Sequence, residues 1–256
     1  MFVGVRDGTA PVILQVPPGE LTASLGQTCV PSRPWAAGLA SAASVGVLLV
    51  ATATSAWLLA AHGYPDGAAL LAPGQPLALS LVLVIVAAVV GSVLHELAHM
   101  VLGRARGQSL PRAKVNGRTA VARTNLTHTW VWPFIPRTAA FGGGLAVDLA
   151  VLSGALLAAG GRPGAAWLVA SVTLLRIAWQ LRPHRRTDGR FLLAHLCDDP
   201  AVVTTAMGVL RGRALGRPGI RHLLALAAMG AGLLLEGFIT YWWGWRLVAQ
   251  LLHVAG

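Results

Sequence analysis

Long apolar stretches, separated by short polar or basic segments, dominate the pattern of this chain. A helix crosses a bilayer with about 20 apolar residues, and five stretches of that kind follow residue 34. They are roughly Trp35–Ala61, Leu77–Leu102, Thr138–Gly160, Pro163–Leu181 and His222–Trp243. A last stretch, Trp245–Val254, either prolongs the fifth or lies at the membrane surface. The pattern predicts an all-α membrane protein, a polytopic bundle of about five to six transmembrane helices.

The composition also indicates a membrane protein, and it separates a short N-terminal segment from the apolar remainder of the chain. Hydrophobic residues make up 55% of the 256 residues and charged residues only 11%, whereas soluble domains carry about 25% charged residues. Residues 1–34 are mixed and contain several prolines, so we expect a loose or weakly strand-forming segment there. The interpretation is an N-terminal cytoplasmic segment over 1–34 and a transmembrane domain over 35–256.

The basic residues predict the orientation in the membrane. Most of the 20 Lys and Arg residues fall in residues 103–137, residues 182–221 and the N-terminal segment. With five spans these regions share one face, which the positive-inside rule makes cytoplasmic. Arg176, inside the fourth stretch, is expected to snorkel toward that face. Topology and contact with the anionic lipid bilayer account for the net charge of +11, so no nucleic-acid partner is expected.

The first basic segment carries a turn signal. In "RAKVNGRTAVART" the pair Asn116-Gly117 separates two short runs. Asn-Gly favours a type I′ turn, because both central positions of that turn need positive φ. The sequence therefore predicts a small cytoplasmic β-hairpin. A short helix is expected within residues 198–219, also at the cytoplasmic face.

The second apolar stretch ends in "GSVLHELAHMVLG", residues 91–103. His95 and His99 are four residues apart, so a helix places both imidazoles on one face. Imidazoles at that spacing can share a Zn²⁺ ion at about 2.0–2.1 Å. Glu96 is turned aside and can reach a water molecule without binding the metal, as a general base must. Ionisable groups in a span are costly, and they therefore indicate function.

A catalytic zinc needs a third protein ligand, and acidic residues are few in this chain. Asp188 follows the fourth stretch at the face where the second stretch ends, so it has the right depth. Asp148 lies in the middle of the third stretch and fits less well. Glu236 is expected toward the opposite face. Asp188 is the predicted third ligand.

These motifs together resemble the site-2-protease family of intramembrane zinc metalloproteases. The family carries HExxH on one core helix and a second motif, roughly N-P-x-x-x-x-D-G, on another. Pro183, Asp188 and Gly189 match the second motif, with Arg182 where the family has Asn. A Gly-rich stretch between the two motifs is matched by "FGGGLAVDLAV", residues 141–151. The resemblance covers residues 77–197.

The resemblance implies a function and roles for single residues. His95, His99 and Asp188 would bind one Zn²⁺ per chain, and Glu96 would be the catalytic base of a metalloendopeptidase. The substrate would be a membrane-embedded or membrane-associated peptide, held as an added strand. Residues expected near the ligands or in the substrate cleft are Asp148, Gly143, Gly144, Arg182, Pro183 and Gly189. The enzyme would be a multi-pass cell-membrane protein with HExxH and Asp188 near the cytoplasmic face.

Two alternatives stay open on the sequence. HELxH on a membrane helix also resembles the CAAX-type and heat-shock-type membrane metalloproteases, whose third ligand is a downstream glutamate; here that residue would be Glu236. The chain could also be a membrane scaffold or immunity protein of the same fold that holds a peptide without cutting it. The departure at Arg182 favours this second alternative.

Overall fold

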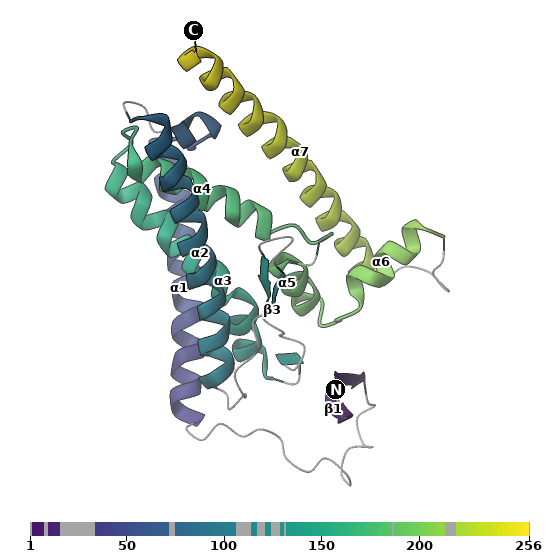
Figure 1. The fold of residues 1–256 in the computed structure, drawn as a ribbon. Helices are drawn as coiled ribbons and strands as arrows, with labels where there is room; N and C mark the ends of the chain where they lie inside the picture. Colours follow the sequence, from purple (N-terminus) through teal and green to yellow (C-terminus); the bar gives the residue numbers. More distant parts are fainter. Residues whose placement is uncertain are drawn as a thin grey trace.

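The computed structural model describes residues 2–7, 10–15, 34–71, 75–105, 114–116, 121–123, 129–130, 132–185, 187–212 and 219–255. Helices make up most of this part of the chain (Figure 1). The longer ones are α1 (Pro34–His62), α2 (Leu77–Ala105), α3 (Phe134–Ala159), α4 (Ala165–Gln180) and α7 (Ile220–Ala255). The short ones are η1 (Gly67–Leu71), α5 (Asp188–Leu196) and α6 (Val202–Leu210).

Four of these helices, α1, α2, α3 and α7, are long and apolar enough to cross a membrane. The 16 residues of α4 extend only about 24 Å at 1.5 Å per residue, short of a hydrocarbon core of about 30 Å. The prediction of five to six spans is therefore too high for the described part of the chain. The stretch after Trp243 does prolong the preceding helix, because α7 continues unbroken to Ala255.

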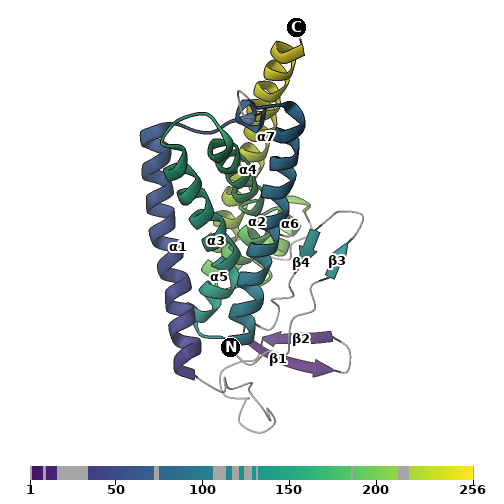
Figure 2. The same cartoon turned by 60° about the vertical axis from the view of Figure 1, so that its left-hand side comes forward.

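Helix α3 is the centre of the bundle. Of its most apolar 18-residue window 61% is buried, compared with 17% in α1 and 6% in α2. Helix α1 runs parallel to α3, and Ser55 Oγ lies 2.8 Å from Ser153 Oγ in the contact between them. Small residues let membrane helices approach closely, and such close packing drives their association because the hydrophobic effect does not act between helices in lipid. Figure 2 shows α1 and α2 on different sides of α3.

Helix α7 crosses the bundle obliquely (Figure 1). Its 36 residues span about 54 Å, so it exceeds the membrane thickness unless it tilts. Near its N-terminal end Ala225 and Met229 pack into a cluster with the buried side chains of α6. Farther along, Trp243 Nε1 donates a hydrogen bond to the carbonyl of Pro65, 3.1 Å away. The helix thus contacts α6 near its beginning and the segment that follows α1 farther along.

Two pairs of short antiparallel strands complete the described structure. Strand β1 (Phe2–Asp7) pairs with β2 (Ala10–Gln15) in the N-terminal segment. Strand β3 (Lys114–Asn116) pairs with β4 (Val121–Arg123), with Asn116 opposite Val121. Asn116, the first central residue of the predicted turn, is the last residue of β3, and four positions separate it from its partner Val121. The predicted two-residue Asn-Gly turn is therefore wrong, because Asn116 pairs within the strand. The helix expected within residues 198–219 is α6.

Candidate metal centre

The described structure brings the two histidines and Asp188 together. Helix α2 presents His95 and His99 on one face, and their Nε2 atoms are 3.3 Å apart. Asp188, the first residue of α5, places its Oδ2 atom 3.0 Å from His95 Nε2 and 3.2 Å from His99 Nε2. The three residues are 2%, 2% and 9% exposed. Three potential ligand atoms therefore converge on one buried point.

The opposite ring nitrogens fix the tautomers of both histidines. His95 Nδ1 lies 2.8 Å from Asp148 Oδ2, and His99 Nδ1 lies 2.8 Å from the carbonyl oxygen of Ala140. Carboxylate and carbonyl oxygens only accept hydrogen bonds, so each Nδ1 carries the proton and donates it. In the neutral rings each Nε2 is then left with a lone pair. Metal-binding histidines usually donate the N–H of their other ring nitrogen to a carboxylate or carbonyl oxygen in this way.

The three converging atoms fit a metal ion. Two Nε2 lone pairs and a carboxylate oxygen face one another with no donor among them, which is unfavourable unless a cation or an extra proton lies between them. A tetrahedral ion about 2.0–2.1 Å from each ligand separates the ligand atoms by about 3.3 Å, close to the distances found. Among the described residues, His95, His99 and Asp188 are the group that could hold a metal ion.

Glycines create the room in which these side chains meet. A Cβ atom on Gly144 of α3 would lie 2.4 Å from His95 Nε2, so a side chain there would displace the ring. A Cβ atom on Gly143 would lie 2.5 Å from a methyl carbon of Leu102. These contacts pack α3 closely against α2, and they place Gly144 beside His95, as expected for a residue near the candidate ligands.

Gly189 has the corresponding role for the third ligand. Its Cβ atom would lie 2.7 Å from the carbonyl carbon of Leu181 and 2.8 Å from the Gln180 oxygen. Only glycine lets the first turn of α5 lie directly against the end of α4.

Asp148 contacts His95, one of the three candidate ligands, and is not a member of the converging group. Its carboxylate is 1% exposed, with Oδ2 accepting from His95 Nδ1 and Oδ1 lying 3.2 Å from Arg176 Nη2. Arg176 is thus turned into the bundle, and the prediction that it snorkels to the membrane surface is wrong. Snorkelling would bring the Arg176 guanidinium to water, but the ion pair with buried Asp148 holds it inside the bundle.

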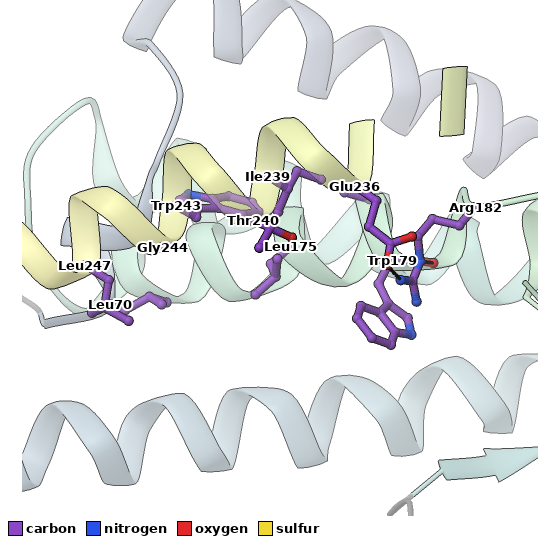
Figure 3. Close-up of a pocket in the computed structure, with 11 residues that line it drawn as sticks. Leu70, Leu175, Trp179, Arg182, Glu236, Ile239, Thr240, Trp243, Gly244 and Leu247 are labelled. Atoms are coloured by element: carbon purple, nitrogen blue, oxygen red, sulfur yellow. Dashed lines mark hydrogen bonds and ion pairs between the residues drawn. The ribbon is translucent and has the colours of Figure 1, made fainter. Parts of the chain in front are cut away.

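Arg182, Pro183 and Glu236 lie together at a different place. Figure 3 shows Arg182 and Glu236 at one end of a groove between α4 and α7. Arg182 Nη1 lies 2.9 Å from Glu236 Oε1, and its guanidinium carbon lies 3.3 Å from the centre of the Trp179 ring. A Cβ atom on Gly232 of α7 would touch Pro183 Cδ at 2.7 Å. The motif positions 182 and 183 therefore connect to α7, whereas positions 188 and 189 build the centre.

The expected position of Glu236, toward the opposite face, is wrong, because its carboxylate lies among the residues that follow α4. Besides Arg182, it accepts a hydrogen bond from His184 Nε2 at 2.8 Å, and Arg185 lies 3.7 Å away. Its carboxylate is thus shared among three basic side chains that follow α4. The alternative in which Glu236 is the third metal ligand finds no support in this arrangement.

His195, seven residues after Asp188 on α5, belongs to another network. Its Nε2 lies 2.7 Å from Thr138 Oγ1, and because Thr138 donates to the carbonyl of Phe134, the histidine is the donor. Burial and the charge of Arg137 lower the pKa of His195 to about 4. His195 is therefore a neutral packing residue that ties α5 to the beginning of α3.

Two groups that support the histidines were not among the predicted site residues. The Ala140 carbonyl that holds His99 is a backbone atom, and no side-chain pattern identifies it. Arg176 could have been found, because an arginine in an apolar stretch without a charged neighbour in sequence needs a partner from another helix. Glu96, the predicted base, lies beside His95 on α2 and is partly exposed.

Comparison with family models, with curated proteins and with solved structures finds no match to this chain.

Proposed function

We propose that the chain is an intramembrane zinc metallopeptidase that hydrolyses peptide bonds of membrane-embedded or membrane-associated peptides. The observation that carries the proposal is the convergence of His95, His99 and Asp188, two imidazoles and a carboxylate whose lone pairs meet at one buried point. Zinc is commonly bound by such ligands, and three protein ligands leave a fourth position for substrate. Glu96, the residue after the first histidine, supplies a carboxylate that is not among these ligands.

The residues would divide the work of hydrolysis. When bound, zinc would supply Lewis-acid chemistry, lowering the pKa of a water molecule and polarising a carbonyl group. The Glu96 carboxylate would take the proton of the attacking water and pass it to the leaving amine. Asp148 and the Ala140 carbonyl would keep both histidines in the tautomer that offers Nε2. The partly exposed position of Glu96, beside buried His95, suits a group that meets both water and substrate.

We also propose an orientation for the site. The basic segments before α1, after α2 and after α4 would face the cytoplasm under the positive-inside rule. His99 lies in the last two turns of α2 and Asp188 follows α4, so the centre would open near the cytoplasmic side of the cell membrane. The short strands β3 and β4, on the segment after α2, would offer an edge to which an extended substrate can pair.

Replacing Glu96 by glutamine tests the proposed reaction. Glutamine keeps the size of the side chain and removes the base, so cleavage should fall by about 10²–10⁴-fold while bound zinc is unchanged. The measurement is cleavage of a panel of quenched fluorescent transmembrane peptides, reconstituted with the purified protein in lipid vesicles. Zinc is determined in the same samples by elemental analysis.

Glu236→Gln is the matched control, because it makes the same chemical change at the other glutamate of the spans. It should retain both zinc and cleavage. If Glu96→Gln cleaves at the wild-type rate, the proposed mechanism is wrong. Wild-type protein that holds zinc but cuts no peptide of the panel would favour the scaffold alternative. Loss of zinc in Glu236→Gln alone would favour the CAAX-type or heat-shock-type alternative.

A further inference from the structure

Arg176 is a cation in the apolar helix α4, and it reaches two other helices. Its side chain is 16% exposed. Nη2 lies 3.2 Å from Asp148 Oδ1 on α3, and Nη1 donates to the carbonyl of Ala88 on α2 at 3.0 Å and also to Ser92 Oγ. A charge inside a membrane helix is costly and is retained where it pairs with a functional group. These contacts place the guanidinium at the junction of α2, α3 and α4.

The path of this side chain crosses α2 just before the first histidine. A Cβ atom on Gly91 would lie 3.0 Å from Arg176 Nε and 3.2 Å from its guanidinium carbon. The arginine therefore lies directly over Gly91, and a larger residue at position 91 would push the Arg176 side chain aside. Gly91, Ser92 and His95 fall within five residues, so the crossing is one turn away from the metal centre.

The two oxygens of Asp148 divide between the arginine and the histidine. Oδ1 faces Arg176, whereas Oδ2 accepts the Nδ1 proton of His95. A planar guanidinium with several donors can hold a carboxylate and a helix carbonyl in fixed relative positions. The second histidine needs no such counter-charge, because its partner is the neutral carbonyl of Ala140.

We propose that Arg176 is a positioning residue of the metal centre. It neutralises and orients Asp148, and through Asp148 it holds the His95 ring with Nε2 turned to the metal. It also fixes α2 against α3 at the turn from which His95 projects. This inference rests on the metal centre of the proposed function and concerns the affinity of that centre for zinc rather than the hydrolytic step.

The test is a double-mutant cycle read as zinc affinity. Zinc dissociation constants are measured by competition with a chromophoric chelator for detergent-purified wild type, Arg176→Met, Asp148→Asn and the double variant. Loss of a partner behind a metal-binding histidine weakens metal binding by about 10–100-fold. Each single variant should lose affinity in that range. The double variant should lose no more zinc affinity than the single variant that binds zinc less tightly, because both substitutions break the same contact.

Arg246→Met is the matched control. It breaks an exposed Arg–Asp pair, Arg246 Nε to Asp66 Oδ2 at 2.7 Å, and should leave zinc affinity unchanged. Arg176→Lys is a second variant that keeps the charge. A single ammonium cannot span both helices as the guanidinium does, so a several-fold loss of affinity is expected. Melting temperatures of the zinc-free proteins show whether a loss of affinity merely follows a loss of stability.

Each outcome bears on a separate statement. Wild type without zinc affinity would remove the metal centre and with it the proposed function. Tight zinc binding by wild type together with wild-type affinity in Arg176→Met would overturn the positioning role and leave the proposed function standing. If Arg176→Met yields no folded protein, Arg176→Lys decides, and unchanged affinity in that variant overturns the role. Additive losses in the cycle would also overturn it, since they would mean that Arg176 acts independently of Asp148.

Discussion

Replacing Asp188 by alanine is expected to empty the metal centre. Asp188 provides one of three converging ligand atoms, and its Oδ2 lies within 3.2 Å of both histidine nitrogens. Two imidazoles alone leave a zinc ion with too few protein ligands for a stable site. Bound zinc should fall from about one per chain in the wild type to below about a tenth. Elemental analysis of detergent-purified protein, after dialysis against a weak chelator, measures this.

Asp199→Ala is the control for this experiment. Asp199 lies just beyond α5 and accepts a hydrogen bond from the backbone of Ala201, so its loss should not affect zinc. Equal zinc in wild type and Asp188→Ala would move the third ligand elsewhere and remove the main support for the proposed function. Analysis for all first-row metals decides a further point. Two histidines and a carboxylate also hold iron(II) in oxygenases, and iron in place of zinc would keep the site but contradict the proposed identity of the metal.

The group of residues that could hold a metal ion could be predicted because its signal is local. Spacing of four on a helix fixes the relation of His95 to His99 whatever surrounds the helix. Asp188 was reached by depth in the membrane, since both α2 and α4 end on the same side. The partners behind the ligands were harder to predict. They depend on how α3 and α4 rotate about their axes, which hydropathy does not specify.

The errors in the fold have a related cause. Hydropathy detects an apolar stretch but not where its helix ends, and the fourth stretch includes Gly164 and Leu181, both outside α4. Glu236 was misplaced because α7 is longer than a membrane needs and runs obliquely, so its sequence position does not give its depth. Arg176 was misplaced because it lies near the end of its apolar stretch, where snorkelling is the simplest expectation. Its partner, Asp148, lies on another helix, and the sequence does not show that the two residues face each other.

Substitution of Gly144 by alanine is expected to damage the centre from the opposite side. The added Cβ atom would lie 2.4 Å from His95 Cε1 and Nε2, so either the ring must turn or α3 must move away from α2. Overpacking of this kind costs about 1–3 kcal/mol. A turned ring would also lose the alignment of Nε2 with the other ligands. Both thermal stability and zinc affinity should therefore fall.

Gly154→Ala provides the matched comparison on the same helix. Gly154 is exposed, and a Cβ atom there would meet nothing within 4 Å. Alanine is favoured over glycine inside a helix by about 1 kcal/mol, so this variant should be slightly stabilised and bind zinc like the wild type. Melting temperature and chelator competition on the two variants measure the contrast. If Gly144→Ala keeps wild-type stability and zinc affinity, the predicted 2.4 Å clash between its Cβ atom and His95 does not occur. Helix α3 would then lie farther from His95 than the structure places it, and the contact of His95 with Asp148, also on α3, would be in doubt as well.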